Sequence, residues 1–242
     1  MSRASSRQHK KEDHDKRMMI HTKELMIASV GNYLSSFAED EEDESAIFRI
    51  LDAMQVVDRS YFVEDKDLSY VDSALPIKDG QTISQPSTVG RMLMLADIQS
   101  DHKILEVGLG SGWNAALLSY LCFPGKVESI EVSEKLYGDV RKRYALLVKI
   151  KQLKPIIKNI MALHGNVFLH KGAYDRVIMT AGISYGQEDL IKDLAKRLLR
   201  DEGLLICPYQ NGPLIIMKKM QNSVIVDYTE EKYAFVPLKI DI

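Results

Sequence analysis

The chain has 242 residues, of which 45% are hydrophobic and 27% charged, and its formal net charge at pH 7 is −2. This composition is that of a globular protein with a sizeable core, and it excludes a low-complexity or fully disordered chain. The small net charge predicts no binding of nucleic acid or of an anionic membrane by bulk electrostatic attraction. No apolar run approaches the roughly 18 residues of a membrane span, so we expect no membrane association.

Three further features concern the cellular compartment. Cys122 and Cys207 each lie in an apolar stretch, which predicts buried thiols in a reducing compartment, not a disulfide framework. The short apolar run Met18–Ile20 is followed at once by charged residues, so we expect no signal peptide. Together these features predict a cytoplasmic protein.

Residues 1–45 are expected to form an N-terminal extension. Met1–Arg17 is rich in charge and almost without apolar side chains, which predicts a partly disordered tail. Met18–Phe37 carries enough apolar residues for a helix, which Gly31-Asn32 is expected to interrupt. The acidic run Glu39–Glu44 favours the N-terminal flank of a helix or a surface loop over a metal site.

Two helices and an irregular segment are predicted before the first strand. Apolar residues recur at helical spacing over about Glu44–Val56, whereas Asp58–Gly80 shows no regular period. A second helix is predicted over Thr88–Asp97. Ser87 or Ser84 is expected to cap it, so one role of these serines is purely structural.

A glycine-rich turn lies at the centre of the chain. The apolar run Ile104–Val107 has the length and composition of a strand, and Gly108, Gly110 and Gly112 lead from it into a stretch with helical spacing. A strand, a glycine turn and a helix form the first unit of a nucleotide-binding α/β sheet. The pattern G-x-G-x-x-G of dinucleotide sites fails, because Trp113 occupies its third glycine position. An acidic residue followed by G-x-G-x-G indicates S-adenosylmethionine, with a tight turn that binds nothing as the alternative.

A second acidic residue supports this prediction. Residues 125–132 have the pattern of the next strand, and Glu131 falls near its carboxyl end, 19 residues after Gly112. At that spacing a carboxylate accepts hydrogen bonds from both ribose hydroxyls of a bound nucleoside. The alternative is a solvated glutamate at the end of a strand.

The remaining elements alternate between helices and strands. Such alternation predicts a doubly wound, mostly parallel α/β sheet of the Rossmann-like type found in S-adenosylmethionine-dependent methyltransferases, with an antiparallel hairpin at its C-terminal end. We expect residues 46–242 to form this single domain. The predicted elements are a helix over 134–152, strands over 159–164 and 174–180, a helix over 187–199, a strand over 204–208, and a hairpin from 214–218 and 223–227.

Seven segments carry a resemblance to a known family. They are Arg59 with Phe62-Val63, Tyr70–Ile77, Gly80–Pro86, Ile104–Asn114, Ala173–Asp175, Gly203–Pro208 and Phe235–Leu238. Over about residues 46–238 the chain resembles the protein-L-isoaspartate O-methyltransferases. The glycine turn occurs in many methyltransferases, but Gln-Thr-Ile-Ser-Gln-Pro, in this order before it, is specific to the isoaspartyl family.

The resemblance implies a reaction and a site. The methyl group of S-adenosylmethionine passes to the carboxylate of an L-isoaspartyl residue in a damaged protein, and the ester closes to a succinimide that reopens partly to aspartate. Ser84 would be the catalytic residue beside the reacting methyl group, no metal ion would be needed, and the protein would be a monomer. The cofactor-binding residues implied are Gln81, Thr82, Ile83, Ser84, Gly108, Leu109, Gly110, Glu131, Val132, Gly165 and Asn166. The residues implied to lie along the substrate peptide are Val236, Pro237 and Leu238.

Two departures from the family pattern lie around the expected cleft. Asn166 stands where the family usually has an aspartate that meets adenine, and the connection from it to Tyr174 is short. Ala181–Ser184 replaces an alanine-rich run that ends in proline. The alternative functions are an RNA (tRNA) methyltransferase, which would carry a basic stripe or an RNA-binding appendage, and a non-catalytic homologue that binds S-adenosylmethionine. The intact segment Gln81–Pro86 argues against loss of activity.

Overall fold

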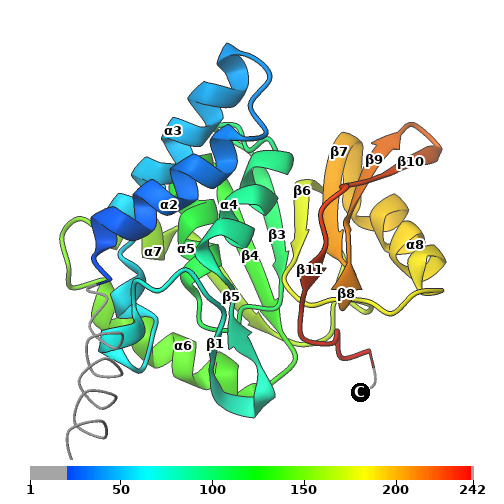
Figure 1. Cartoon of the computed structure of the whole chain (residues 1–242). Coiled ribbons are helices and arrows are strands. Elements are labelled where there is room, and N and C mark those ends of the chain that lie inside the picture. Colours follow the sequence, from blue (N-terminus) through cyan, green and yellow to red (C-terminus); the bar gives the residue numbers. More distant parts are fainter. Residues whose placement is uncertain (1–20, 241–242) are drawn as a thin grey trace, which may run out of the picture.

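The computed structural model describes residues 21–240, and a seven-stranded sheet in the order β10-β9-β7-β6-β3-β4-β5 forms its centre (Figure 1). β3 to β7 run parallel, and β9 and β10 form an antiparallel hairpin at one edge. The predicted fold class and hairpin are therefore confirmed. The strands are β3 (Lys103–Val107), β4 (Lys126–Glu131), β5 (Ile160–His164), β6 (Tyr174–Met179), β7 (Leu199–Pro208), β9 (Leu214–Met220) and β10 (Ser223–Tyr228).

The strand order places a crevice at the end of β3. The chain passes from β3 to β4 and β5 in one direction, and then returns to pair β6 with the other side of β3. Where the order reverses, the connections leave on opposite faces of the sheet, and a ligand site opens beyond the carboxyl ends of the strands. The glycine turn follows β3 at this point.

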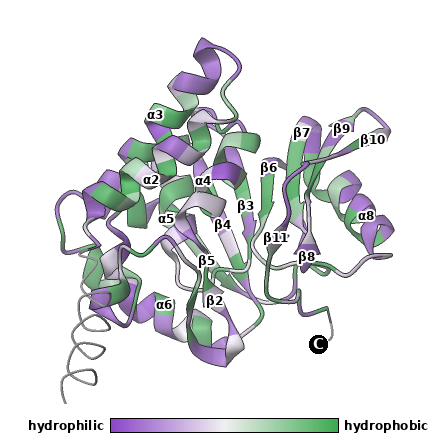
Figure 2. Cartoon of the chain, in the orientation of Figure 1, coloured by the Kyte–Doolittle hydropathy of each residue, from purple (hydrophilic) through white to green (hydrophobic). Residues whose placement is uncertain are grey.

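The side chains of each strand alternate between two cores. Ile104 of β3 packs into the core on one face, whereas Leu105 and Val107 pack into the core on the other. Both faces of the central strands are therefore apolar, which is why they read as continuous hydrophobic runs. In Figure 2 hydrophobic residues cover much of β6 and β7, whereas α3 and α8 carry both hydrophilic and hydrophobic residues.

Helices cover both faces of the sheet. α8 (Glu188–Leu198) packs against β6, β7, β9 and β10. Buried side chains of the other long helices join the opposite core. These helices are α2 (Lys23–Ser35), α3 (Glu41–Val56), α4 (Pro86–Leu95), α5 (Trp113–Cys122), α6 (Glu134–Leu147) and the short α7 (Lys154–Lys158).

α2 and α6 differ from the sequence predictions. α2 runs without a break through Gly31. A Cβ atom at this position would lie 3.1 Å from Leu51 on α3, so the glycine permits the two helices to pack closely. The expected extension over residues 1–45 thus contains a helix with Val30 and Leu34 in the main core. The predicted disordered tail lies outside the described residues. The helix predicted over 134–152 ends at Leu147, and α7 begins separately at Lys154.

The segment predicted to be irregular contains only short elements. These are the 3-10 turns η1 (Arg59–Tyr61), η2 (Lys66–Leu68) and η3 (Lys78–Gly80) and the two-residue strand β1 (Leu75–Pro76), which pairs with β2 (Thr82–Ile83) just after the segment. A second short ladder pairs β8 (Asn211–Gly212) with β11 (Tyr233–Ala234).

Both cysteines are buried and unpaired, as predicted. Burial raises the pKa of the Cys122 thiol to about 12, so it is inert at neutral pH. None of the helices between residues 21 and 240 is both long and apolar enough to cross a bilayer.

Candidate active site

The glycine turn is held tightly against the end of β6. Gly108, Gly110 and Gly112 all have positive φ angles, of 98°, 51° and 84°. A Cβ atom on Gly108 would lie 2.4 Å from Oγ1 of Thr180, whose hydroxyl donates to the Gly108 carbonyl over 2.7 Å. Only glycine fits at position 108, because any side chain would displace the threonine that fixes the turn.

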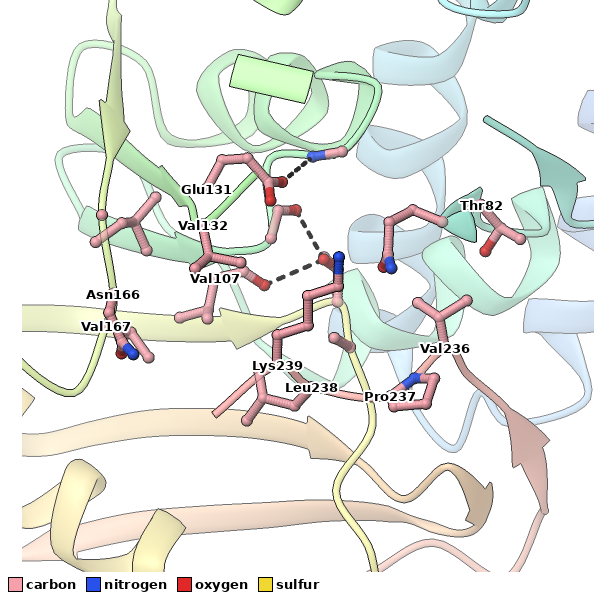
Figure 3. Close-up of a pocket in the computed structure, with 17 residues that line it drawn as sticks. Thr82, Val107, Glu131, Val132, Asn166, Val167, Val236, Pro237, Leu238 and Lys239 are labelled. Carbon is pink, nitrogen blue, oxygen red and sulfur yellow. Dashed lines mark hydrogen bonds between the residues drawn. The ribbon is translucent and has the colours of Figure 1, made fainter. Parts of the chain in front are cut away.

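Glu131 is the last residue of β4, and its side chain connects the end of β4 to the glycine turn that follows β3. Its carboxylate accepts hydrogen bonds, each over 2.9 Å, from the backbone N–H of Gly110, which Figure 3 shows, and from that of Ser133. The residue is only 6% exposed. Each carboxylate oxygen keeps a further lone pair, so two hydroxyl groups on one ligand can still be bound.

Glu106, the acidic residue that precedes the glycine turn, does not add a negative charge to the site. Glu106 is fully buried, and it accepts hydrogen bonds from the Asn114 amide over 2.9 Å and from the Ser129 hydroxyl. Burial raises the pKa of Glu106 to about 8, so its carboxyl group is mostly protonated at neutral pH. Trp113 is also buried and donates from Nε1 to the Val57 carbonyl, so it connects the turn to α3.

A buried arginine organises the loop that precedes the glycine turn. Arg59 has no exposed surface, and its guanidinium lies 5.4 Å from the centroid of the Trp113 ring. Burial lowers the pKa of Arg59 to about 10, so the group remains charged at neutral pH. It donates to four backbone carbonyls of one loop, namely those of Ser69 (2.9 Å), Val71 (3.2 Å), Ser73 (3.0 Å) and Ser84 (3.3 Å).

The helix that follows this loop is capped by Asp72, a residue of the loop itself. Asp72 accepts hydrogen bonds from the backbone N–H of Ser87, over 2.9 Å, and from the Ser87 hydroxyl. α4 begins at Pro86 with Gln85 as its N-cap, and no side chain of Gln85 takes part. The expectation that Ser84 or Ser87 caps this helix is therefore wrong, because a loop aspartate supplies the cap.

The C-terminal segment runs along the mouth of the cleft. The N–H of Gly182 donates to the Val236 carbonyl, and the N–H of Leu238 donates to the Gly182 carbonyl, both over 2.8 Å. This pairing attaches residues 236–238 to the loop after β6 (Figure 3).

All residues predicted for the site line one of two adjoining hollows, which share Thr82, Gly108, Gly110 and Thr180. The larger is lined by Glu131 and the smaller by Ser84. Of the predicted residues, those in the larger hollow are Gln81, Thr82, Gly108, Gly110, Glu131, Val132, Gly165, Asn166, Val236, Pro237 and Leu238. Those in the smaller are Thr82, Ile83, Ser84, Gly108, Leu109 and Gly110.

Comparison with known proteins decides the family. The family model for protein-L-isoaspartate(D-aspartate) O-methyltransferases matches residues 39–241. The chain is also 34% identical to the protein-L-isoaspartate O-methyltransferase of Thermosipho melanesiensis over 197 residues, which cover 78% of this chain and 93% of that relative. The chain belongs to the protein-L-isoaspartate O-methyltransferase family.

Solved structures support the same fold. One protein-L-isoaspartate O-methyltransferase structure matches with a TM-score of 0.70 at 20% identity, and the match covers 90% of this chain but 66% of that longer one. A β-aspartate methyltransferase from Plasmodium falciparum, solved in complex with S-adenosyl-L-homocysteine, matches with a TM-score of 0.68 at 21% identity. That match covers 88% of this chain and 98% of the other.

Asn166, where the resemblance implies an aspartate in other family members, lies in the loop after β5. Its side-chain oxygen accepts from the N–H of Phe168 over 2.8 Å, and its side-chain nitrogen donates to the Ile240 carbonyl over 3.3 Å. The amide thus ties the loop after β5 to the C-terminal segment. It retains one lone pair for a ligand, which is fewer than a free carboxylate would offer.

The residues at the cleft that the sequence prediction missed include Thr180 and Lys239. Thr180 lines both hollows, and its position at the end of the strand predicted over 174–180 was the available signal. Lys239 lines the larger hollow immediately after the predicted segment Val236–Leu238. Among residues 21–240, no group of three or more His, Cys, Asp or Glu side chains is placed to hold a metal ion.

Proposed function

We propose that this protein transfers the methyl group of S-adenosylmethionine to the carboxylate of L-isoaspartyl residues in damaged proteins and thereby begins their repair. We further infer that it works in the cytoplasm as a monomer. The observation that carries the proposal is the meeting of Ser84 with the glycine turn in one hollow, next to Glu131 in the adjoining one. Family membership supports the reaction.

The lining of the cleft fits this cofactor better than a dinucleotide. Lys239 is the only lysine or arginine among the described residues that line the two hollows, so little positive charge is available to a pyrophosphate. Two lone pairs of the Glu131 carboxylate match a pair of ribose hydroxyls. The smaller hollow has no ionised side chain, and it leaves space beside Gly110 for another part of the cofactor. When bound, S-adenosylmethionine supplies an activated methyl group on a sulfonium.

The protein then has mainly to align the substrate. A carboxylate is ionised and nucleophilic at neutral pH, so no strong general base is required, and correct positioning accounts for much of the rate. We assign Ser84 the role of donating a hydrogen bond that orients the attacking carboxylate. Val236–Leu238 would bind the peptide backbone and exclude water from the larger hollow.

A matched pair of peptides tests the proposal. The purified protein is incubated with methyl-labelled S-adenosylmethionine and either an isoaspartyl peptide or the same peptide with normal aspartate. We expect a base-labile methyl ester on the isoaspartyl peptide only. Equal labelling of both peptides would refute the specificity.

A binding measurement separates the non-catalytic alternative. Calorimetry with S-adenosylhomocysteine is done on the same preparation. Binding together with isoaspartyl-dependent labelling supports the enzyme, whereas binding without any labelling would mean that the chain is a cofactor-binding homologue. Labelling of tRNA instead of peptide would favour the RNA methyltransferase.

A further inference from the structure

We propose that Tyr185 forms an aromatic subsite for a planar side chain of the substrate, an aromatic ring or an arginine guanidinium, two to four residues from the isoaspartate. This inference rests on the proposed function and adds a preference for the sequence around the damaged residue.

Tyr185 is a large aromatic side chain that is mostly exposed. Its relative exposure is 67%, and its ring stacks on that of Tyr209 with 4.2 Å between the centroids and 23° between the planes. The Tyr209 hydroxyl in turn donates to Glu188 on α8. Since stacking covers one face of Tyr185, the exposed area belongs to its other face and its edges.

The exposed ring is also held in place. Its hydroxyl lies 3.4 Å from the Asn211 carbonyl, and it sits over Gly212, where an added Cβ would come within 2.6 Å of the hydroxyl oxygen. Any side chain at position 212 would push the ring away. An aromatic ring that is already fixed loses little conformational entropy when a partner stacks on it, and such residues dominate binding at protein interfaces.

The ring stands beside the segment proposed to bind the peptide. Gly182, three residues before Tyr185, pairs with Val236 and Leu238. The partner of Asn211 in the β8–β11 ladder is Ala234, two residues before Val236. Two extended residues span about 7 Å, and we place the side chain that stacks on Tyr185 two to four residues from the isoaspartate of a peptide bound along 236–238.

The loop that carries Tyr185 is itself held in place. Ser184 accepts a hydrogen bond from the Gln210 amide over 2.9 Å. That bond helps to fix the loop, and with it the Tyr185 ring, against the start of β8.

The test compares peptides that differ at one position. Isoaspartyl peptides carry Phe, Arg, Leu or Ala at each position from two to four residues on either side of the isoaspartate, and KM and kcat are measured with wild type, Tyr185→Ala and Tyr185→Phe. For wild type we expect a KM with Phe or Arg about three- to tenfold lower than with Ala at one of these positions, with similar kcat. Tyr185→Ala should abolish that ratio, and Tyr185→Phe should preserve it.

The outcomes separate the two proposals. If wild type methylates none of the isoaspartyl peptides, the proposed function fails. If wild type methylates them all but neither the Phe nor the Arg peptides differ in KM from the Ala peptides, or if the difference is the same in Tyr185→Ala, the subsite alone is refuted. A Leu peptide bound as tightly as the Phe peptide would also overturn it, since general hydrophobicity would then suffice.

Discussion

The two sides of the cleft are built in different ways. The turn after β3 is local: a strand, three glycines and a helix follow one another within about 20 residues, and Glu131 of the neighbouring strand completes it. The loop that carries Ser84 has almost no regular structure, and a buried arginine binds four of its carbonyls from inside. The side formed by the turn after β3, which we call the turn side, depends for its shape on backbone conformation. The side formed by the loop with Ser84, the loop side, depends for its shape on the buried charge of Arg59 and its four carbonyl partners.

This difference decides what a substitution does. Substitutions on the turn side should lower cofactor affinity or destabilise the sheet, because the turn directly follows β3, a central strand of the sheet. Changes on the loop side should act on alignment of the substrate, because the two-residue pairing of β1 with β2 is too short to preserve the shape of the loop without Arg59. The following predictions test that separation, beginning with the largest expected effect.

Arg59→Ala should be the most damaging change. It removes the donor of four backbone carbonyls, buried at Ser69 and partly buried at the other three, and we expect a loss of about 3–5 kcal/mol in the free energy of unfolding. Denaturant titration measures it. Arg200→Ala is the control, because Arg200 forms an exposed ion pair with Asp175 and should cost less than about 1 kcal/mol. Equal losses in the two variants would mean that the buried arginine does not support the loop.

Glu106 makes stability depend on pH. Because its pKa is raised in the folded state to about 8, the native protein holds a proton that the unfolded chain has already lost above pH 5. This contribution to stability is present at low pH and is lost as pH rises through 8, by about 3 kcal/mol between pH 5.5 and 8.5. Unfolding curves of wild type and Glu106→Gln should diverge by that amount, with the variant gaining at high pH. Parallel pH profiles would show that Glu106 is ionised throughout.

Glu131→Ala tests the turn side. It should weaken binding of S-adenosylhomocysteine by roughly 1.5–3 kcal/mol, because a charged acceptor is lost. Glu128→Ala, three residues earlier on β4 and outside both hollows, should leave the Kd unchanged. If calorimetry finds the same loss in both variants, the effect comes from damage to β4.

Ser84→Ala tests the loop side. The change should lower turnover tenfold or more through lost alignment, with little change in melting temperature, because Asp72 caps α4 without it. Ser87→Ala should show the opposite pattern, a loss of about 1 kcal/mol in stability with turnover nearly intact, because the hydrogen bond from the Ser87 hydroxyl to Asp72 is lost. Full activity in Ser84→Ala would remove the serine from catalysis.

The turn side was predictable from the sequence and most of the loop side was not. Spacing alone placed Glu131 at the end of β4, and family resemblance brought Ser84 and Val236–Leu238 to the same cleft. The cap on α4 was missed because Asp72 lies 15 residues from Ser87, and the partners of Arg59 are carbonyls, which leave no trace in the side-chain pattern. The prediction of a helix break at Gly31 was wrong, because the low helix propensity of glycine does not take account of the packing of this position against Leu51.

Arg59→Lys provides the most direct test of the central claim that the buried arginine positions the substrate side of the cleft. Lysine keeps the charge but presents one ammonium group, which cannot span all four carbonyls. On one preparation, the Kd of S-adenosylhomocysteine and kcat/KM for an isoaspartyl peptide are measured. We predict that kcat/KM falls at least tenfold while the Kd changes by less than about threefold. A Kd that rises in proportion to the loss of kcat/KM would contradict the claim, because the two sides of the cleft would then be a single unit.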